Sequence, residues 1–225
     1  MSAVTRTRSA APVVAAAKAA EKPAVSTEAV RQVFAAKLNS KLQELSATGT
    51  EAAQPEFWWD LMAIGPIQFA PPALSPAAVV DIGDTAYVIT VLVLNPALML
   101  PGPTSPKAVL ETFNLTVDLT YSTGNKTTWT LAEPACQLTG AIPLSPGGGI
   151  FGSEFYVDVQ AFSPTTAGLH EMNITANIPG MGGIPSFFGG YSAWTLDLDF
   201  DWLAYYLGFS TENPDRRPVL FQVQP

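Results

Sequence analysis

Residues 113–131 read FNLTVDLTYSTGNKTTWTL, and this stretch decides the fold. In its first half, apolar and polar residues alternate without interruption from Phe113 to Tyr121. Successive side chains of a β-strand point to opposite faces, so the alternation predicts a strand with one buried face. Residues 122–125 have turn composition, and residues 127–131 resume the alternation. The stretch therefore predicts a β-hairpin, which needs a second sheet to cover its apolar face.

Further segments repeat the strand pattern. The run TAYVITVLVL at 85–94 is apolar on both faces apart from Thr90. Such a strand lies centrally and needs a cover on its outer side, for which a predicted N-terminal helix and the aromatic residues FWW at 57–59 are candidates. The prolines and glycines of residues 56–70 and 132–152 predict irregular segments instead. Together with 85–94, the strands predicted outside the hairpin are 78–82, 153–162, 168–178, 193–202 and, at an edge, 218–223.

Turn-rich loops, and not helices, separate these strands, in a chain with 20 prolines and 17 glycines. This organisation predicts an all-β domain, an antiparallel two-sheet β-sandwich. The order of the strands suits an immunoglobulin-like or fibronectin-III-like topology, with a jelly roll as the alternative.

One passage carries a resemblance to such domains. Residues 163–178, SPTTAGLHEMNITANI, resemble the turn-then-strand passage common in immunoglobulin-like domains, where a glycine precedes an alternating strand. The resemblance covers this passage and the strand count. Cys136 is the only cysteine, so the intrachain disulfide of antibody domains is absent. The sequence therefore predicts an architecture and no particular family.

The chain before the sandwich divides into three parts. Residues 1–25 are rich in Ala, Pro and Arg and are predicted to form a flexible tail. Residues 26–47 predict an amphipathic helix, because apolar residues recur there at spacings of three and four. Residues 48–55 predict a linker, and the β-sandwich is expected to span residues 56–225.

Two apolar groups are candidates for contact with a partner. The stripe of the predicted helix must pack on the sandwich, on another copy of itself or on a partner protein. The glycine-rich loop at 179–192 holds large apolar residues, which either cover an open end of the sandwich or contact another protein. The candidate interaction residues are Phe34, Leu38 and Leu42 of the stripe and Met181, Ile184, Phe187, Phe188 and Tyr191 of the loop.

The chain is acidic, with a formal net charge of −8. Residues 56–225 carry four basic and fifteen acidic side chains, a net charge of −11. This acidic body repels phosphate backbones, so nucleic-acid binding by the folded domain is not expected. No apolar run approaches the ~18 residues of a transmembrane segment. The single cysteine and the poor match of the N-terminus to a secretory signal favour the cytoplasm over export, without identifying a compartment.

Few residues of the types used in catalysis or metal binding are present. His170 is the only histidine, and its place among inward-facing strand residues favours a structural role over a catalytic triad. One histidine and one cysteine exclude a zinc site built from several such ligands. Asp197, Asp199 and Asp201 alternate on one predicted strand face, which indicates a solvated face, a calcium site or catalytic acids. No cofactor is expected.

These observations predict a non-catalytic β-sandwich module for protein interaction or structure, tethered or oligomerised through its N-terminal helix. Its partner would be another protein or a second copy of the chain. A self-assembling shell or capsid-like subunit, with the tail as an inner arm, is one alternative. A hydrolase that uses Asp197, Asp199, Asp201 or Glu154 is another, and it requires a cleft containing two of those carboxylates.

Overall fold

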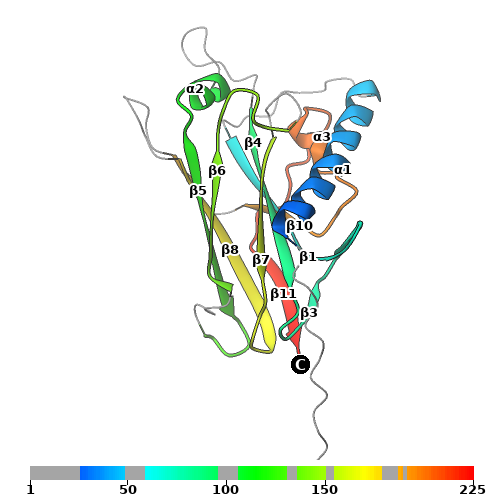
Figure 1. Cartoon of the computed structure of the whole chain (residues 1–225), viewed down its shortest axis with the longest axis vertical. Helices are drawn as coiled ribbons and strands as arrows, with labels where there is room; N and C mark the ends of the chain where they lie inside the picture. The colour runs from blue at the N-terminus through cyan, green and yellow to red at the C-terminus, as the bar shows by residue number, and fades with distance from the viewer. Residues whose placement is uncertain are drawn as a thin grey trace, which may run out of the picture.

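The computed structural model describes residues 26–48, 59–95, 106–130, 136–150, 155–178, 187–189 and 192–225. Its strands form two sheets that pack face to face, and helix α1 lies against the outer face of one of them (Figure 1). The mostly β architecture with two sheets and an N-terminal helix confirms the expectation from sequence at this level. The predicted tail at 1–25 and nearly all of the predicted linker lie outside the described residues.

The first sheet has five strands in the order β10-β1-β4-β7, with β2 beside β1. Strands β1, β4 and β7 are antiparallel to their neighbours in this series, and β10 joins β1 in parallel. All nine residues of β4 are buried, as expected for a central strand covered on both sides. The strands are β1 Trp59–Ala70, β2 Ala73–Pro76, β4 Ala86–Leu94, β7 Phe155–Phe162 and β10 Ala193–Thr195.

The second sheet has six strands in the order β3-β11-β8-β5-β6, with β9 beside β8. In both β5 and β8, buried residues alternate with more exposed ones, so one face meets the first sheet and the other faces outward. The strands are β3 Val79–Asp81, β5 Thr116–Asn125, β6 Leu138–Pro143, β8 Gly168–Ile178, β9 Phe187–Gly189 and β11 Val219–Gln224.

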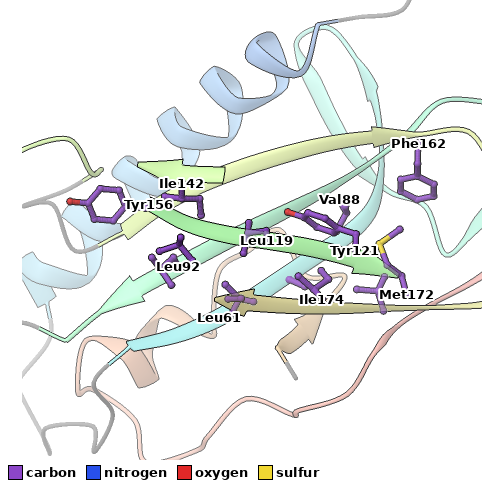
Figure 2. Packing of buried hydrophobic residues seen from close by; sticks show 14 of the residues in the cluster. Leu61, Val88, Leu92, Leu119, Tyr121, Ile142, Tyr156, Phe162, Met172 and Ile174 are labelled. Atoms are coloured by element: carbon purple, nitrogen blue, oxygen red, sulfur yellow. The ribbon is translucent and has the colours of Figure 1, made fainter. Parts of the chain in front are cut away.

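The main core lies between the two sheets. Figure 2 shows side chains from both sheets meeting in this layer, among them Leu61, Leu92 and Leu119. A polar connection crosses this layer at Tyr121. The Tyr121 hydroxyl of β5 donates to Asp158 Oδ2 of β7 at 2.9 Å and lies 2.9 Å from the fully buried Thr90 Oγ1 of β4. The bond between the two hydroxyls satisfies a polar group that would otherwise weaken an apolar layer.

A second core covers the outer face of the first sheet. Helix α1, Thr27–Thr48, contributes its apolar stripe, and its Val30, Phe34, Leu38 and Leu42 side chains are fully buried against residues of β1, β4 and β7. The short helix α3, Leu203–Tyr206, covers the same face. The remaining helix is α2, Pro106–Thr112. None of the helices in the described part of the chain is both long and apolar enough to cross a membrane.

The predicted hairpin at 113–131 is wrong in its second half. Strand β5 runs through the expected turn to Asn125, and its partners are β6 and β8. Residues 126–129 form the turn, and only an isolated bridge joins Asn125 to Thr130. Trp129, predicted to lie in the second strand of the hairpin, is 80% exposed. The turn lies four residues later than predicted because the Asn125 side chain accepts hydrogen bonds from the backbone of Thr127 and Thr128 and so reverses the chain after β5.

Two segments predicted to be irregular contain strands. Residues 59–70 form β1, which continues past Gly65 and Pro66 because the register shifts there at a bulge. Gly65 has a φ of 129°, and a Cβ there would lie 2.8 Å from the Tyr87 carbonyl oxygen, so glycine is required. Residues 138–143, predicted to be part of an irregular connection, form β6 beside β5.

The C-terminal strands also differ from prediction. Only residues 193–195 of the predicted strand 193–202 pair in a sheet, and the chain then bends and turns up to α3. Phe200 has a φ of 63°, a value outside the β region, so the alternation over 196–202 does not describe a strand face. Strand β11, predicted at an edge, lies between β3 and β8.

Candidate functional site

The turn after β5 is held by the side chain of Asn125, which is 3% exposed. Its Oδ1 accepts hydrogen bonds from the backbone N–H groups of Thr127 at 2.9 Å and Thr128 at 3.1 Å. Its Nδ2 donates to the Ala167 carbonyl oxygen at 3.0 Å. An asparagine that bonds its own backbone in this way stabilises a turn.

Strand β8 is hydrogen-bonded to the same turn. The backbone N–H of Lys126 donates to the Leu169 carbonyl oxygen at 2.7 Å, and the backbone N–H of Leu169 donates to Thr127 Oγ1 at 2.8 Å. The loop is therefore connected to β8 through a main-chain and a side-chain hydrogen bond. These bonds fix the backbone that carries the outermost side chain of the loop.

That outermost side chain is Trp129. It is the most exposed large apolar residue in the described part of the chain, and its φ of 55° lies in the left-handed region, which bulky residues rarely adopt. The Lys126 ammonium nitrogen lies 5.6 Å from the centroid of the indole ring, a cation–π distance. A strained backbone that presents an aromatic ring to solvent indicates a functional surface.

A cleft of about 330 Å³ lies between this turn and the outer face of the second sheet. Glu171 Oε2 lies 3.1 Å from Lys126 Nζ, and Asn173 Nδ2 donates to Glu171 Oε1 at 3.3 Å. The ion pair leaves this part of the cleft without net charge. The cleft is lined by Ser122, Thr123, Gly124, Asn125, Lys126, Trp129, Thr130, Gln137, Glu171 and Asn173. We call this the Trp129 cleft.

A second cleft, also of about 330 Å³, lies beside the segment that follows β10. Its lining is acidic and aromatic, and the Arg217 guanidinium lies 4.8 Å from the Trp194 ring centroid. The lining residues are Met62, Trp194, Thr195, Asp197, Asp201, Trp202, Tyr205, Ser210, Glu212, Asn213, Pro214, Asp215 and Arg217. We call this the acidic cleft.

A half-buried ion pair lies beside residues of the acidic cleft. Arg216 Nη1 and Nη2 donate to the two carboxylate oxygens of Asp60 at 2.7 and 2.5 Å, and the Tyr206 hydroxyl donates to Asp60 Oδ2 at 3.0 Å. The hydrogen bond to Asp60 raises the pKa of Arg216. Burial, and then the Asp60 charge, raise the pKa of Tyr206 well above its usual value. The cluster ties α3 and the following segment to β1.

The three aspartates singled out from sequence do not form one array. Asp197 and Asp201 line the acidic cleft, whereas Asp199 is exposed and is not part of its lining. Asp197 Oδ1 accepts from the Asp199 backbone N–H at 2.6 Å, a local turn contact. Within the described ranges, no three His, Cys, Asp or Glu side chains are placed to hold a metal ion. The geometry therefore does not support a calcium site at these aspartates. Glu154, the other candidate catalytic acid, lies outside the described residues.

The predicted interaction surface on the helix is wrong. Phe34, Leu38 and Leu42 have no exposed surface, because they pack on the first sheet of their own chain. The stripe is therefore not available to tether or oligomerise the protein. The loop residues Met181, Ile184 and Tyr191 lie outside the described residues, as do the side chains of Phe187 and Phe188, whose backbone belongs to β9. That part of the prediction stays a prediction.

His170 occupies the structural position expected for it. The side chain is fully buried, its Nε2 lies 2.9 Å from the Thr166 carbonyl oxygen, and its ring stacks on Phe221 with centroids 5.3 Å apart. It contributes to the core beneath the turn that carries Trp129.

The residues of the Trp129 cleft were missed in the sequence because residues 127–131 were predicted to form the second strand of a hairpin. One signal could have found it. Residues 125–128, NKTT, begin with an asparagine, which favours a turn through bonds to the backbone two residues on. A turn starting there removes Trp129 from the strand alternation.

No protein-family model matches the chain, and no curated protein matches it. Among solved structures, the CARDB domain of a Pyrococcus furiosus protein, in complex with di-metal ions, shares 13% identity. The match covers 61% of this chain and 90% of that domain with a TM-score of 0.29. A solution NMR structure of that domain shares 12% identity, covering 64% of this chain and 99% of the other with a TM-score of 0.26.

A Pseudomonas fluorescens alkylpurine DNA glycosylase, AlkC, bound to DNA containing an abasic site analog, is also similar. It shares 12% identity over 72% of this chain and 36% of its own, with a TM-score of 0.26. Likenesses at this level assign neither a family nor a function to this chain.

Proposed function

We propose that this protein is a non-catalytic β-sandwich module that binds its partner in the Trp129 cleft. The observation that carries the proposal is Trp129 itself, 80% exposed on a turn that Asn125 and Thr127 hold against the sheet. A large aromatic ring on a rigid support binds with little loss of conformational entropy. The neighbouring polar side chains supply the orienting hydrogen bonds that binding sites use.

The strand order supports an immunoglobulin-like version of this module over a jelly roll. Lettered A to G in chain order, the main strands are β1, β4, β5, β6, β7, β8 and β11, which gives sheets A-B-E and G-F-C-D. Immunoglobulin constant domains have sheets A-B-E-D and C-F-G. The two arrangements differ only in strand D, β6, which here belongs to the sheet of strands C, F and G. Such sandwiches serve as supports for binding surfaces in many unrelated proteins.

The experiment compares the full chain with two single variants on arrays that carry saccharides, peptides and lipids. Trp129→Ala removes the exposed ring, and Phe113→Ala removes another exposed aromatic side chain, 43% exposed, outside the cleft. Wild type and Phe113→Ala are expected to bind the same probes, and Trp129→Ala is expected to lose them. Binding that is independent of Trp129, or no binding to any probe, would overturn the proposal.

A second candidate function rests on the acidic cleft. Asp197 and Asp201 both line it, which is the arrangement that a hydrolase using two carboxylates requires. The test is hydrolysis of nitrophenyl glycosides and nitrophenyl esters by the full chain across acidic pH. A hydrolase would lose about 100-fold or more of its rate in Asp197→Asn/Asp201→Asn, and Asp199→Asn, outside the cleft lining, would not. Equal rates in all variants exclude this function.

A further inference from the structure

We infer that the ligand of the Trp129 cleft is a neutral saccharide, an inference that rests on the binding function proposed above. It follows from the shape of the cleft floor, the chemistry of its lining and its lack of net charge, each taken below in turn.

The cleft floor is a hollow in the sheet itself. Ser122 pairs with Asn173 and Gly124 with Glu171 across the β5–β8 ladder. All four lie on the outward face, and Gly124 contributes no side chain, so the backbone forms the floor beside Glu171. Side chains on strands of a paired sheet are held more precisely than side chains on loops. The floor is therefore shaped in advance of binding.

The chemistry around this floor matches a sugar ring. A pyranose presents C–H groups on its faces and hydroxyl groups around its rim. The C–H face stacks on an aromatic ring such as that of Trp129. The Ser122 hydroxyl, the Asn173 amide and the Glu171 carboxylate include both hydrogen-bond donors and acceptors, as hydroxyl groups require.

Charge argues for a neutral ligand. The ammonium of Lys126 and the carboxylate of Glu171 lie 3.1 Å apart and compensate each other within the cleft. The chain as a whole carries a net charge of −8, which disfavours polyanions such as nucleic acids or sulfated polymers. A volume of about 330 Å³ is at the lower end of the roughly 300–1,000 Å³ of small-molecule sites, which suits a short saccharide.

A peptide is the main competing ligand for the same surface. Peptides that bind to sheets add a strand to an unpaired edge. The part of β5 that lies in the cleft floor, residues 122–125, is paired with β8 on one side, whereas the pairing of β5 with β6 ends at Tyr121. The exposed surface of the cleft is mainly apolar, so it suits the anchor side chain of a peptide as well as the C–H face of a sugar, and the titration below distinguishes the two ligands.

The test is isothermal titration of the full chain with cello-, malto-, manno-, xylo- and chito-oligosaccharides. At least one series is expected to bind the wild type, with an affinity that does not change with salt concentration, because the ligand is uncharged. Trp129→Ala should weaken binding about tenfold or more, as for the central aromatic anchor of a site. Phe113→Ala, outside the cleft, should bind as the wild type does.

A second variant separates loss of the site from loss of the fold. Gly124 has no positive φ and lies within β5, where a β-branched residue is favourable, so Gly124→Val is expected to narrow the cleft without breaking the strand. It should abolish binding with an unchanged melting temperature. Failure of all five series to bind, or binding unaffected by Trp129→Ala and Gly124→Val, overturns the inference. If a peptide or lipid probe binds instead, and its binding depends on Trp129, the ligand is not a saccharide but the proposed binding function holds.

Discussion

The guanidinium of Arg216 contacts both carboxylate oxygens of Asp60, at 2.7 and 2.5 Å, and so joins the C-terminal segment to the start of β1. The two partners differ in environment, because the side chain of Asp60 is 5% exposed and that of Arg216 is 41% exposed. A charge that is left buried without a partner is costly, whereas a charge that can reach water is not. The contribution of this pair is therefore asymmetric.

Removal of Arg216 should cost more stability than removal of the Asp60 charge. Arg216→Met leaves a buried carboxylate and should lower the free energy of unfolding by about 2 kcal/mol, less than for a fully buried pair because Arg216 is partly solvated. Asp60→Asn keeps an acceptor for Tyr206 and should cost about 1 kcal/mol. Urea denaturation measures both. Arg31→Met, which breaks an exposed pair with Glu28 on α1, is the control and should cost about 0.5 kcal/mol or less. A larger loss for Asp60→Asn would contradict the asymmetry.

The stripe of α1 should contribute to stability and not to self-association. Leu42 has no exposed surface, so Leu42→Ala should lower the free energy of unfolding by about 3 kcal/mol through lost burial and a cavity. The exposed neighbour Gln43, changed to Ala, should shift it by less than about 0.5 kcal/mol. Light scattering should give the same molar mass for both variants and the wild type. A change in mass with Leu42→Ala would restore an oligomerising role for the helix.

Alkaline pH should destabilise the fold through its buried tyrosines. Burial, followed by the charge of Asp158, raises the pKa of Tyr121 well above 10.0, and Tyr206 is raised in the same direction. The folded state then holds protons that the unfolded state releases. The stabilisation is complete below about pH 10 and is lost as pH rises, by at most about 1.4 kcal/mol per pH unit for each tyrosine. Urea denaturation between pH 8 and about 11 should show this slope, and Tyr121→Phe should make it shallower. Parallel profiles would contradict the assignment.

Substitution of Asn125 should destabilise the protein, whereas substitution of Trp129 on the same turn should not. Asn125→Ala removes the hydrogen bonds of a buried side chain to Thr127, Thr128 and Ala167, so the free energy of unfolding should fall by about 2 kcal/mol. Asn125→Asp keeps the two acceptor bonds and should lose less. Trp129→Ala, at a solvent-exposed side chain, should change stability by less than about 0.5 kcal/mol. A large loss with Trp129→Ala would mean that the ring belongs to the fold and not to a binding surface.

Local patterning was enough to predict the elements that have one buried face. Strand β8 has the predicted limits 168–178, and α1 lies within about a residue of the predicted helix, because in both a single apolar face must be covered. The central position of β4 followed from its apolar residues on both faces. The sequence predicted a cover for it, and α1 provides that cover.

The errors occurred where tertiary contacts decide the backbone. Strand β1 continues through Gly65 and Pro66 since a bulge accommodates them, and the Trp194 indole N–H bonds the freed Gly65 carbonyl at 2.6 Å. Residues 196–202 alternate like a strand, yet they turn to place Phe200 and Trp202 in the core under α1. For the candidate site, the alternation of the sequence correctly predicted the polar face of β5. The position of Trp129 could not be predicted, because it depends on a hydrogen bond from Asn125 to Ala167, 42 positions away.

Hydrogen–deuterium exchange of the full chain, with and without the saccharide that gives the strongest titration signal, tests the central claim most directly. If the Trp129 cleft is the binding site, amides of residues 122–130 and 169–173 gain protection on binding, and those of 197–217 at the acidic cleft are unchanged. Protection that is confined to the acidic cleft, or no saccharide that alters exchange at the Trp129 cleft, would contradict the account.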